Sequence, residues 1–294
     1  MNFFHIFSIL FIINNKNILS CMFEKVNPSH PDKIADRIAG AIVDYAYRQI
    51  SDPTIAVEVL IGHGKCTIII ESNIYNLLIP TVIEDIVHRI CEDNTIKVDL
   101  FRIPQDIYLN RNQEGVIKCG DNGIFKGATI TSEQRLLTNI AHTLYSNNPH
   151  DGKYLIDNNK ITICQSWDTE ENIRNILSGY NNYNFVINPL GSWKGGIGVD
   201  CGATNRKLGS DMGDGITGGG LHGKDLSKAD VTLNIYCFLM ANTIGEENTY
   251  QLSCSIGDDY VDGKSYSEIV DIAKDYIKNI GGFEKLAEWG LIRP

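Results

Sequence analysis

The sequence contains no CxxC pair, although it has 8 cysteines in 294 residues. This absence excludes zinc ribbons and thioredoxin-like redox motifs, because both need closely spaced cysteine pairs. The cysteines are scattered along the chain. We therefore predict free thiols in a reduced compartment, most of them acting as small buried apolar residues. A disulfide framework is the alternative.

The chain also lacks an excess of basic residues. Lys and Arg number 26 against 36 Asp and Glu, which gives a net charge of -10. No sustained basic stripe is present, which argues against a dedicated nucleic-acid-binding protein. An anionic ligand would need basic contacts that are local and concentrated. The composition, 43% apolar and 21% charged, excludes a disordered chain and a coiled coil, and the length allows a sizeable core without disulfide or metal staples.

No apolar stretch reaches transmembrane length. The apolar run at residues 3–13 is too short to span a bilayer, and no basic segment precedes it as in a signal peptide. We predict that residues 1–21 are a leader or upstream segment outside the folded protein, with translation starting at Met22. This interpretation implies a cytoplasmic protein without membrane contacts. The alternative is an exported lipoprotein, because Leu19-Ser20-Cys21 is similar to a lipoprotein cleavage site.

The hydrophobic pattern predicts an α+β protein of three related units. In the first part of the chain, apolar spacing predicts a helix over 31–50, strands over 54–61 and 65–71, a helix from Pro80 and a strand over 96–103. A similar order of elements then follows twice more. We predict three sheets, each with helices on one face, in a pseudo-threefold arrangement. The predicted parts are the non-structural segment 1–21, an N-terminal unit 22–104, a central unit 118–190 and a C-terminal unit 191–294.

Glycine is concentrated in one region. Residues 195–223 contain 11 of the 27 glycines, and glycine lets a backbone approach a ligand closely. Basic residues lie among and after them, at Arg206, Lys207, Lys224 and Lys228. Neither a Walker A spacing nor a GxGxxG segment after a strand is present. We therefore predict a phosphate cradle of another kind; a flexible linker is the alternative.

Two short clusters combine carboxylates with cations. The segment 30–33, His-Pro-Asp-Lys, lies at a predicted helix N-terminus, where the helix dipole favours phosphate. Lys224, Lys228 and Asp230 lie at the start of a long apolar helix. Each cluster alone is typical of a solvated surface. With the glycine region they indicate a polyphosphate held by cations and by carboxylate-bound Mg²⁺, which prefers hard oxygen ligands.

Six motifs together carry a resemblance to a known family. They are HPDKIAD at 30–36, GDNG at 120–123, DGK at 151–153, INPLG at 187–191, DCGATNRK at 200–207 and GGGLHGKDLSKAD at 218–230. In this order and spacing, the chain resembles S-adenosylmethionine synthetase, also called methionine adenosyltransferase, over residues 22–256. It departs from the family at Ser29, His222 and Leu226, where Gly, Ser and Pro are usual. The C-terminal unit is expected to be shortened.

The resemblance implies a reaction in two parts. The methionine sulfur attacks C5′ of ATP and the triphosphate leaves; the triphosphate is then hydrolysed to pyrophosphate and phosphate. A thioether sulfur needs no base, so the difficulty is the negative charge that develops on O5′, where preorganised donors help most. The implied ligands are ATP, L-methionine, two Mg²⁺ per site and K⁺. The implied assembly is a homodimer or dimer of dimers with sites at the subunit interface.

The resemblance also implies roles for individual residues. Catalysis is assigned to His30, Lys153, Arg206 and Lys224. ATP binding is assigned to His30, Asp151, Gly152, Lys153, Ser192, Trp193, Asp200, Arg206, Lys207, Leu221 and Lys224. Methionine binding is assigned to Glu71, Gln105, Asp121, Asp200 and Lys228. Metal binding is assigned to Asp32 and Asp230 for Mg²⁺ and to Glu58 for K⁺.

Other residues match no family motif. We predict that His222 is structural or on the surface, and that Trp167 and Trp289 are core aromatics. Two functions are possible for the chain: an active enzyme, or a non-catalytic homologue that binds nucleotide or stabilises a partner. The complete set of expected phosphate contacts favours the enzyme.

Overall fold

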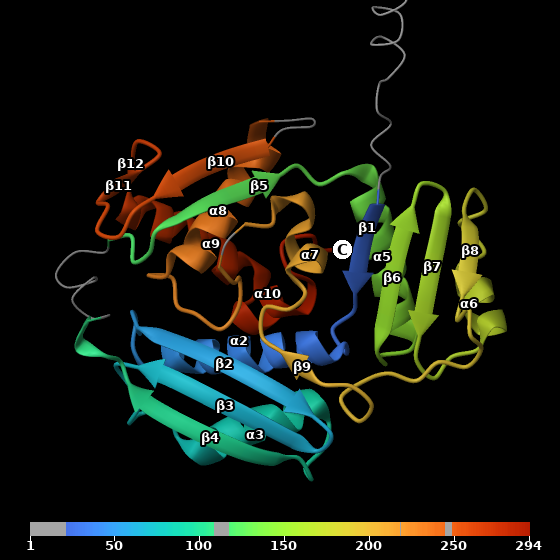
Figure 1. Ribbon diagram of the computed structural model, residues 1–294, viewed down its shortest axis with the longest axis horizontal. Coiled ribbons are helices and arrows are strands. Elements are labelled where there is room, and N and C mark those ends of the chain that lie inside the picture. Colours follow the sequence, from blue (N-terminus) through green and yellow to red (C-terminus); the bar gives the residue numbers. More distant parts are fainter. Residues whose placement is uncertain (1–21, 109–117, 218, 245–248) are drawn as a thin grey trace, which may run out of the picture.

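The structure, a computed structural model, describes residues 22–108, 118–217, 219–244 and 249–294. The predicted leader 1–21 lies outside the described residues. No helix within these ranges is long and apolar enough to span a membrane. The fold is α+β as predicted, with several small sheets and helices packed against them (Figure 1).

The first sheet has four strands in the order β4-β3-β2-β9. Their bounds are β2 (Ile55–Gly62), β3 (Lys65–Ser72), β4 (Lys97–Pro104) and β9 (Gly202–Ala203). The turn between β2 and β3 has positive φ at both His63 and Gly64, which matches the twist of a two-residue hairpin. Helices α2 (Pro31–Gln49) and α3 (Pro80–Cys91) cover one face of this sheet (Figure 1). Residues of β2 alternate between buried and more exposed positions because its other face is open.

Helix α2 begins where the sequence predicts. Pro31 occupies its first turn, and His30 is the N-cap that accepts a hydrogen bond from the Asp32 N–H. At Gly40, α2 contacts the start of α10 (Phe283–Trp289). A Cβ on Gly40 would lie 2.6 Å from the Phe283 carbonyl oxygen. The absent side chain therefore lets α10 pack directly on α2.

The second sheet has the order β1-β6-β7-β8. Its strands are β1 (Met22–Val26), β6 (Gly152–Asp157), β7 (Lys160–Gln165) and β8 (Asn184–Ile187), and its helices are α5 (Ser132–Asn147) and α6 (Glu170–Ile176). Thr131 caps α5 in a capping box with Gln134, so Ser132 is the first helical residue. The apolar faces of the sheet and α5 form a core that also receives Trp289.

The remaining elements lie against the helical centre of the molecule. Two ribbons pair β5 (Gly123–Ala128) with β10 (Thr249–Cys254) and β11 (Tyr260–Val261) with β12 (Lys264–Ser265). The helices are α7 (Leu208–Met212), the 3₁₀ turn η1 (Gly213–Gly215), α8 (Ala229–Ile244) and α9 (Tyr266–Ile280). Helix α8 is apolar around most of its circumference and contacts β5, β10 and α9, so it belongs to the interior.

The sheets do not coincide with the three predicted sequence ranges. β1 pairs with β6, β9 pairs with β2, and β10 pairs with β5. The ranges 22–104, 118–190 and 191–294 therefore exchange strands. Their boundaries and the pseudo-threefold arrangement stay predictions.

Two aromatic residues test the expected core. Trp289 is buried, as predicted, whereas Trp167 is 60% exposed. The prediction for Trp167 is wrong because this residue lies in a turn after β7, with a positive φ of 58°. The seven cysteines in the described ranges are free thiols, although the sulfur atoms of Cys119 and Cys254 lie 3.0 Å apart.

Candidate active site

His30 presents an unpaired donor at the N-terminus of α2. Its Nδ1 atom accepts from the Asp32 N–H at 3.1 Å, so a neutral ring must carry its proton on Nε2. Within the described part of the chain, Nε2 is buried without a hydrogen-bond partner. Burial, reinforced by the charges of Lys153 and Lys207, lowers the pKa of His30 to about 3. At neutral pH the ring is an uncharged N–H donor that awaits an acceptor.

Asp32 gathers the cations of the glycine-rich region beside His30. Its carboxylate accepts from the Ala203 N–H at 2.9 Å and lies 3.6 Å from Arg206 and 3.9 Å from Lys207. The approach depends on Gly202, where a Cβ would lie 2.0 Å from the Pro31 carbonyl oxygen. Arg206 remains 59% exposed, so its charge is available to a ligand.

The second sheet contributes Asp151, Gly152 and Lys153 at the start of β6. Lys153 Nζ lies 5.8 Å from the centre of the Trp193 ring, and Lys153 is one of the charges that lower the pKa of His30. Asp151 accepts from the Gly196 N–H at 2.8 Å, while its other oxygen is buried without a partner in the described residues. Burial raises the pKa of Asp151 to about 6. One carboxyl oxygen of Asp151 therefore holds the Gly196 backbone, and the other could accept a hydrogen bond from a ligand.

Strand β2 brings the third set of residues to the same region. On this strand, Val59 accepts a hydrogen bond from the Thr204 N–H at 3.1 Å, and two residues away the Val57 N–H donates to Gly223 at 2.6 Å. The segment before Arg206 and the segment before Lys224 therefore dock side by side on one strand. Lys224 forms an ion pair with Asp230, and Glu58 of β2 accepts from the Thr204 hydroxyl.

The sequence-predicted methionine contacts lie farther out. Glu71 is opposite Ala56 in the first sheet, and Ala56 also bridges to Lys224. At strand spacing, this row places the Glu71 and Lys224 backbones about 10 Å apart. Gln105 accepts from the Thr54 hydroxyl at 2.6 Å.

The other residues assigned by the resemblance form no hydrogen bond or ion pair with His30 or Asp32 among the described residues. Asp121 precedes β5, and its carbonyl accepts from the thiols of Cys119 and Cys254. Lys228 lies near Asp225: burial raises the pKa of Asp225, and the charge of Lys228 partly offsets this effect. Ser192 and Asp200 are exposed. The side chain of Leu221 is fully buried, so only its backbone could reach a ligand.

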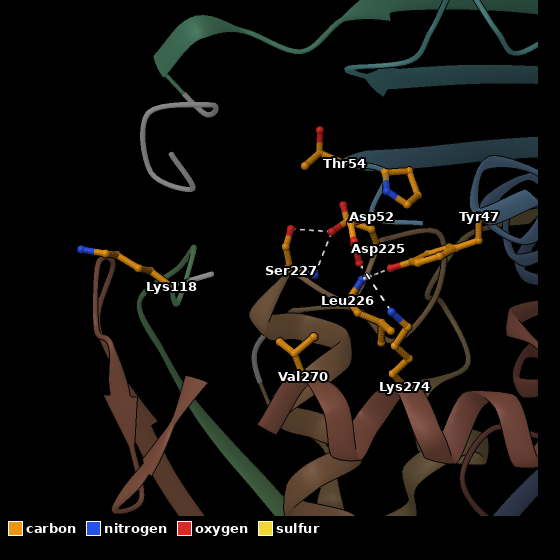
Figure 2. Close-up of a pocket in the computed structure, with 10 residues that line it drawn as sticks. Tyr47, Asp52, Thr54, Lys118, Asp225, Leu226, Ser227, Val270 and Lys274 are labelled. Atoms are coloured by element: carbon orange, nitrogen blue, oxygen red, sulfur yellow. Dashed lines mark hydrogen bonds and ion pairs between the residues drawn. The ribbon is translucent and has the colours of Figure 1, made fainter. Parts of the chain in front are cut away.

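A small pocket lies beyond this cluster, with a volume of about 180 Å³. It is bordered by Tyr47, Thr54, Asp225 and Ser227, and Figure 2 shows Asp225 bonded to Ser227 and the Tyr47 hydroxyl directed at Leu226. None of the residues that line this pocket is among the predicted ATP, methionine or metal contacts. The pocket therefore borders the site without forming it.

A cluster of buried charged residues, none of them assigned as a ligand contact by the sequence, lies directly behind the site. Lys33 Nζ is 2.7 Å from Asp211 and 3.2 Å from Asp36, and His222 Nε2 is 2.9 Å from Asp211. All four side chains are buried. The two carboxylates and the imidazole are spaced as metal ligands could be, but the Lys33 ammonium supplies the positive charge there. Lys33 and Asp36 belong to the HPDKIAD motif, but no signal in the sequence pointed to Asp211, which comes from α7.

Comparison with known proteins adds an independent line of argument. Residues 20–107 match the family described as S-adenosylmethionine synthetase, N-terminal domain. The chain is 30% identical over 310 residues to S-adenosylmethionine synthase of Mycoplasma mycoides subsp. mycoides SC, covering 83% of this chain and 79% of the relative. It is 26% identical over 297 residues to S-adenosylmethionine synthase of Helicobacter acinonychis, covering 80% and 77%.

A solved structure has a similar fold. It is described as an unusual S-adenosylmethionine synthetase from Campylobacter jejuni, and it aligns with a TM-score of 0.70 over 92% of this chain and 93% of that chain. The sequence identity is 20%, so this likeness concerns the fold alone.

Proposed function

Because the chain belongs to the S-adenosylmethionine synthase family, we propose that it is a transferase that forms S-adenosyl-L-methionine from ATP and L-methionine, with release of phosphate and pyrophosphate. The observation that carries this proposal is the His30 Nε2–H. Within the described part of the chain this donor is buried, neutral and without a hydrogen-bond partner, and it lies among the charges of Lys153, Lys207 and Arg206. Such a donor suits an oxygen that gains negative charge during the reaction.

In the first step, a lone pair of the methionine sulfur forms the S–C5′ bond while the C5′–O5′ bond breaks. The bonding electrons pass to O5′ of the departing triphosphate. His30 donates its Nε2 proton in a hydrogen bond to O5′, and no base is needed because the sulfur has no proton to lose. Arg206, Lys207, Lys153 and Lys224 bind the triphosphate oxygens, and Trp193 packs against the adenine.

In the second step, water attacks the bound triphosphate and one P–O bond breaks to give pyrophosphate and phosphate. The same cations hold both products. In this step the negative charge develops on an oxygen between two phosphate groups and no longer on O5′. His30 therefore contributes less to the second step than to the first.

The donor set of the site fits Mg²⁺. Asp32 and Asp230 offer carboxylate oxygens, and each already lies against a cation that a phosphate would attract, Lys207 and Lys224 respectively. Bound there with phosphate, two Mg²⁺ ions would neutralise the triphosphate. Glu58 offers a further carboxylate, which the proposal assigns to K⁺. A cytoplasmic location accords with ATP as substrate and with free thiols.

The open face of the first sheet supports a homodimer. Glu58, with Leu60 on the same strand, lies on the exposed face, together with Ile69 and Phe101 of the neighbouring strands. Leu60 is 54% exposed and Phe101 is 55% exposed. A second copy that covered this apolar face would also enclose Glu58 and Glu71 and so complete the site at a subunit interface. The assembly would be one dimer or a dimer of dimers.

Assay of the purified chain with ATP, L-methionine, Mg²⁺ and K⁺ tests the proposal. We expect S-adenosylmethionine, phosphate and pyrophosphate in equal amounts. A folded protein that binds ATP and forms none of these products would instead be a non-catalytic homologue.

Light scattering and subunit mixing test the assembly. Glu71→Ala and Arg206→Ala subunits, each inactive alone, should recover part of the activity in mixed dimers if the two residues serve one site from different subunits. A fully active monomer would refute the dimer.

A further inference from the structure

We propose that Asn205 is a positioning residue. Its side chain fixes the backbone just before Lys224 relative to Arg206, so that both cations bind the same polyphosphate. This inference rests on the proposed function, because it assumes that Arg206 and Lys224 bind one ligand. Asn205 belongs to none of the predicted contacts. It lies immediately before Arg206, in the turn that follows β9.

The backbone of Asn205 is in the left-handed region, with φ at 63°. Asparagine tolerates this conformation better than most residues with a side chain. Glycine would adopt it with less strain, so the conformation alone does not require Asn. The reason for this side chain must lie in what its amide binds.

The Asn205 amide closes on the backbone of the neighbouring segment. Its Oδ1 accepts from the N–H groups of Leu221 at 2.8 Å and His222 at 2.9 Å, and its Nδ2 donates to the His222 carbonyl at 3.1 Å. The fit leaves no space at Gly220, where a Cβ would lie 2.5 Å from Asn205 Cγ. One side chain therefore binds the backbone just before Lys224 by three hydrogen bonds.

These bonds belong to a closed circuit of buried groups. The Asn205 N–H donates to Asp36 at 2.8 Å, Asp36 binds Lys33, Lys33 binds Asp211, and Asp211 binds the His222 ring. His222 is thus held by its backbone through Asn205 and by its ring through Asp211. The circuit links the start of α2, the turn after β9, the turn before Lys224 and α7.

The circuit fixes the positions of the two segments that carry the cations relative to each other. Arg206 and Lys224 repel each other as like charges, and the repulsion would favour their separation. Both segments also dock on β2: Val57 and Ile55 bond the backbone on either side of Lys224, and Val59 bonds Thr204. The Asn205 amide adds a direct link between the segments, and buried Asp36 anchors it.

Asn205→Gly is the direct test, because glycine keeps the left-handed backbone and removes only the three side-chain bonds. In the full-length protein, calorimetry with Mg²⁺ and inorganic tripolyphosphate should show about tenfold weaker binding. The matched control is Asn158→Gly, at an exposed left-handed turn residue between β6 and β7; its binding should equal that of the parent.

A double-mutant cycle separates positioning from general stability. If Asn205 acts by placing Lys224, then in a Lys224→Ala background Asn205→Gly should cost less than about twofold. In a Lys153→Ala background, on β6 outside the circuit, the tenfold loss should persist. A folded Asn205→Gly protein with unchanged binding, or a loss that adds fully to that of Lys224→Ala, would overturn the proposal.

Three further outcomes are distinguishable. If Asn205→Gly does not fold, Gly220→Ala takes its place, because its Cβ displaces the Asn205 amide; the same cycle and criteria apply. If the parent binds tripolyphosphate but makes no S-adenosylmethionine, the proposed function fails. The binding measurements on the Asn205 variants still decide whether Asn205 is a positioning residue. If the parent binds no tripolyphosphate, both proposals are overturned.

Discussion

Two charged clusters lie one helical turn apart on α2 and differ in how their polar atoms are satisfied. His30 and Asp32 lie at the helix start; among the described residues Nε2 of His30 has no partner, and Arg206 and Lys207 lie 3.6 Å and 3.9 Å from Asp32. Lys33 and Asp36, on the same helix, are paired at 3.2 Å and joined by further buried bonds. Both clusters are buried and both contain a carboxylate.

The difference teaches how to separate a ligand site from a scaffold. A buried polar atom without a partner destabilises the fold unless something else binds it. Within the described residues Nε2 of His30 is such an atom, which indicates that it binds an acceptor on a ligand. In the inner cluster Asp211 and Asp36 raise the pKa of Lys33 above its usual value, overcoming the opposite effect of burial, so its charges stabilise one another.

The largest expected effect is on the outer cluster. Removal of divalent cations by EDTA should abolish S-adenosylmethionine formation, because Asp32 and Asp230 would otherwise face the triphosphate as unscreened like charges. The assay follows product with and without chelator, and excess Mg²⁺ should restore activity. Full turnover in the chelated sample would refute the assignment of these carboxylates to metal.

The inner cluster should respond to Lys33→Met with a loss of stability. The variant leaves Asp36 and Asp211 buried without their cation, and the free energy of unfolding should fall by about 3–5 kcal/mol. Urea unfolding measures the change. The matched control is Arg89→Met, which breaks the exposed Arg89–Glu284 ion pair and should cost about 1 kcal/mol or less. Equal losses in the two variants would contradict the distinction between buried and exposed pairs.

The outer cluster should respond to His30→Asn with a loss of catalysis and little loss of stability. Asparagine also caps helices well, but it cannot place a donor where Nε2 lies. Formation of S-adenosylmethionine should fall on the order of 10²–10³-fold, while hydrolysis of added tripolyphosphate should fall much less. The control is His63→Asn in the exposed β2–β3 turn. Equal loss in both half-reactions would remove the role of His30 at O5′.

The smallest effect concerns Asp151 and depends on pH. Its pKa in the folded protein, about 6, lies above the ordinary value of 3.8, so the folded state binds a proton more tightly than the unfolded state. The stability that protonation provides is present below pH 4 and is lost as the pH rises to 6. Asp151→Asn avoids this loss and should be more stable than the parent at pH 7, by at most about 3 kcal/mol.

Urea unfolding at pH 7 and at pH 4 tests this prediction, since the advantage of Asp151→Asn should shrink toward zero at the lower pH. Asp99→Asn on the exposed edge of β4 is the control. An advantage that is the same at both pH values would show that burial of the Asp151 charge is not its cause.

Local signals in the sequence predicted the elements well. Helix α2 is observed at Pro31–Gln49, close to the predicted range 31–50, because the His30 cap and Pro31 define its start. The strand exchanges were not predicted. Pairing of β1 with β6 joins segments far apart in the chain, and a strand's own apolar alternation specifies which face is buried but not which strand is its neighbour.

The same limit applies to the site. Motif residues such as His30, Asp32 and Arg206 were identified because the family resemblance covers them, and the structure brings these three together. The circuit through Asn205 and Asp211 was missed. Nothing in the spacing of two polar residues shows that their partners are buried beside them, since those partners come from another helix and another turn.

Lys25 on β1 has a consequence for synthesis on the ribosome. Its ammonium is buried and donates to the carbonyls of Ser210, Trp289 and Ile292, each at 2.8 Å. At bacterial or eukaryotic elongation rates of about 5–20 residues per second, Ile292 emerges roughly 13–50 seconds after Lys25, which it follows by 267 positions. A nascent β1 must remain hydrated through that interval. Trp289 and Ile292 therefore cover Lys25 only after they have been made, and a chain released before then would leave this charged side chain of β1 open to chaperones and proteases.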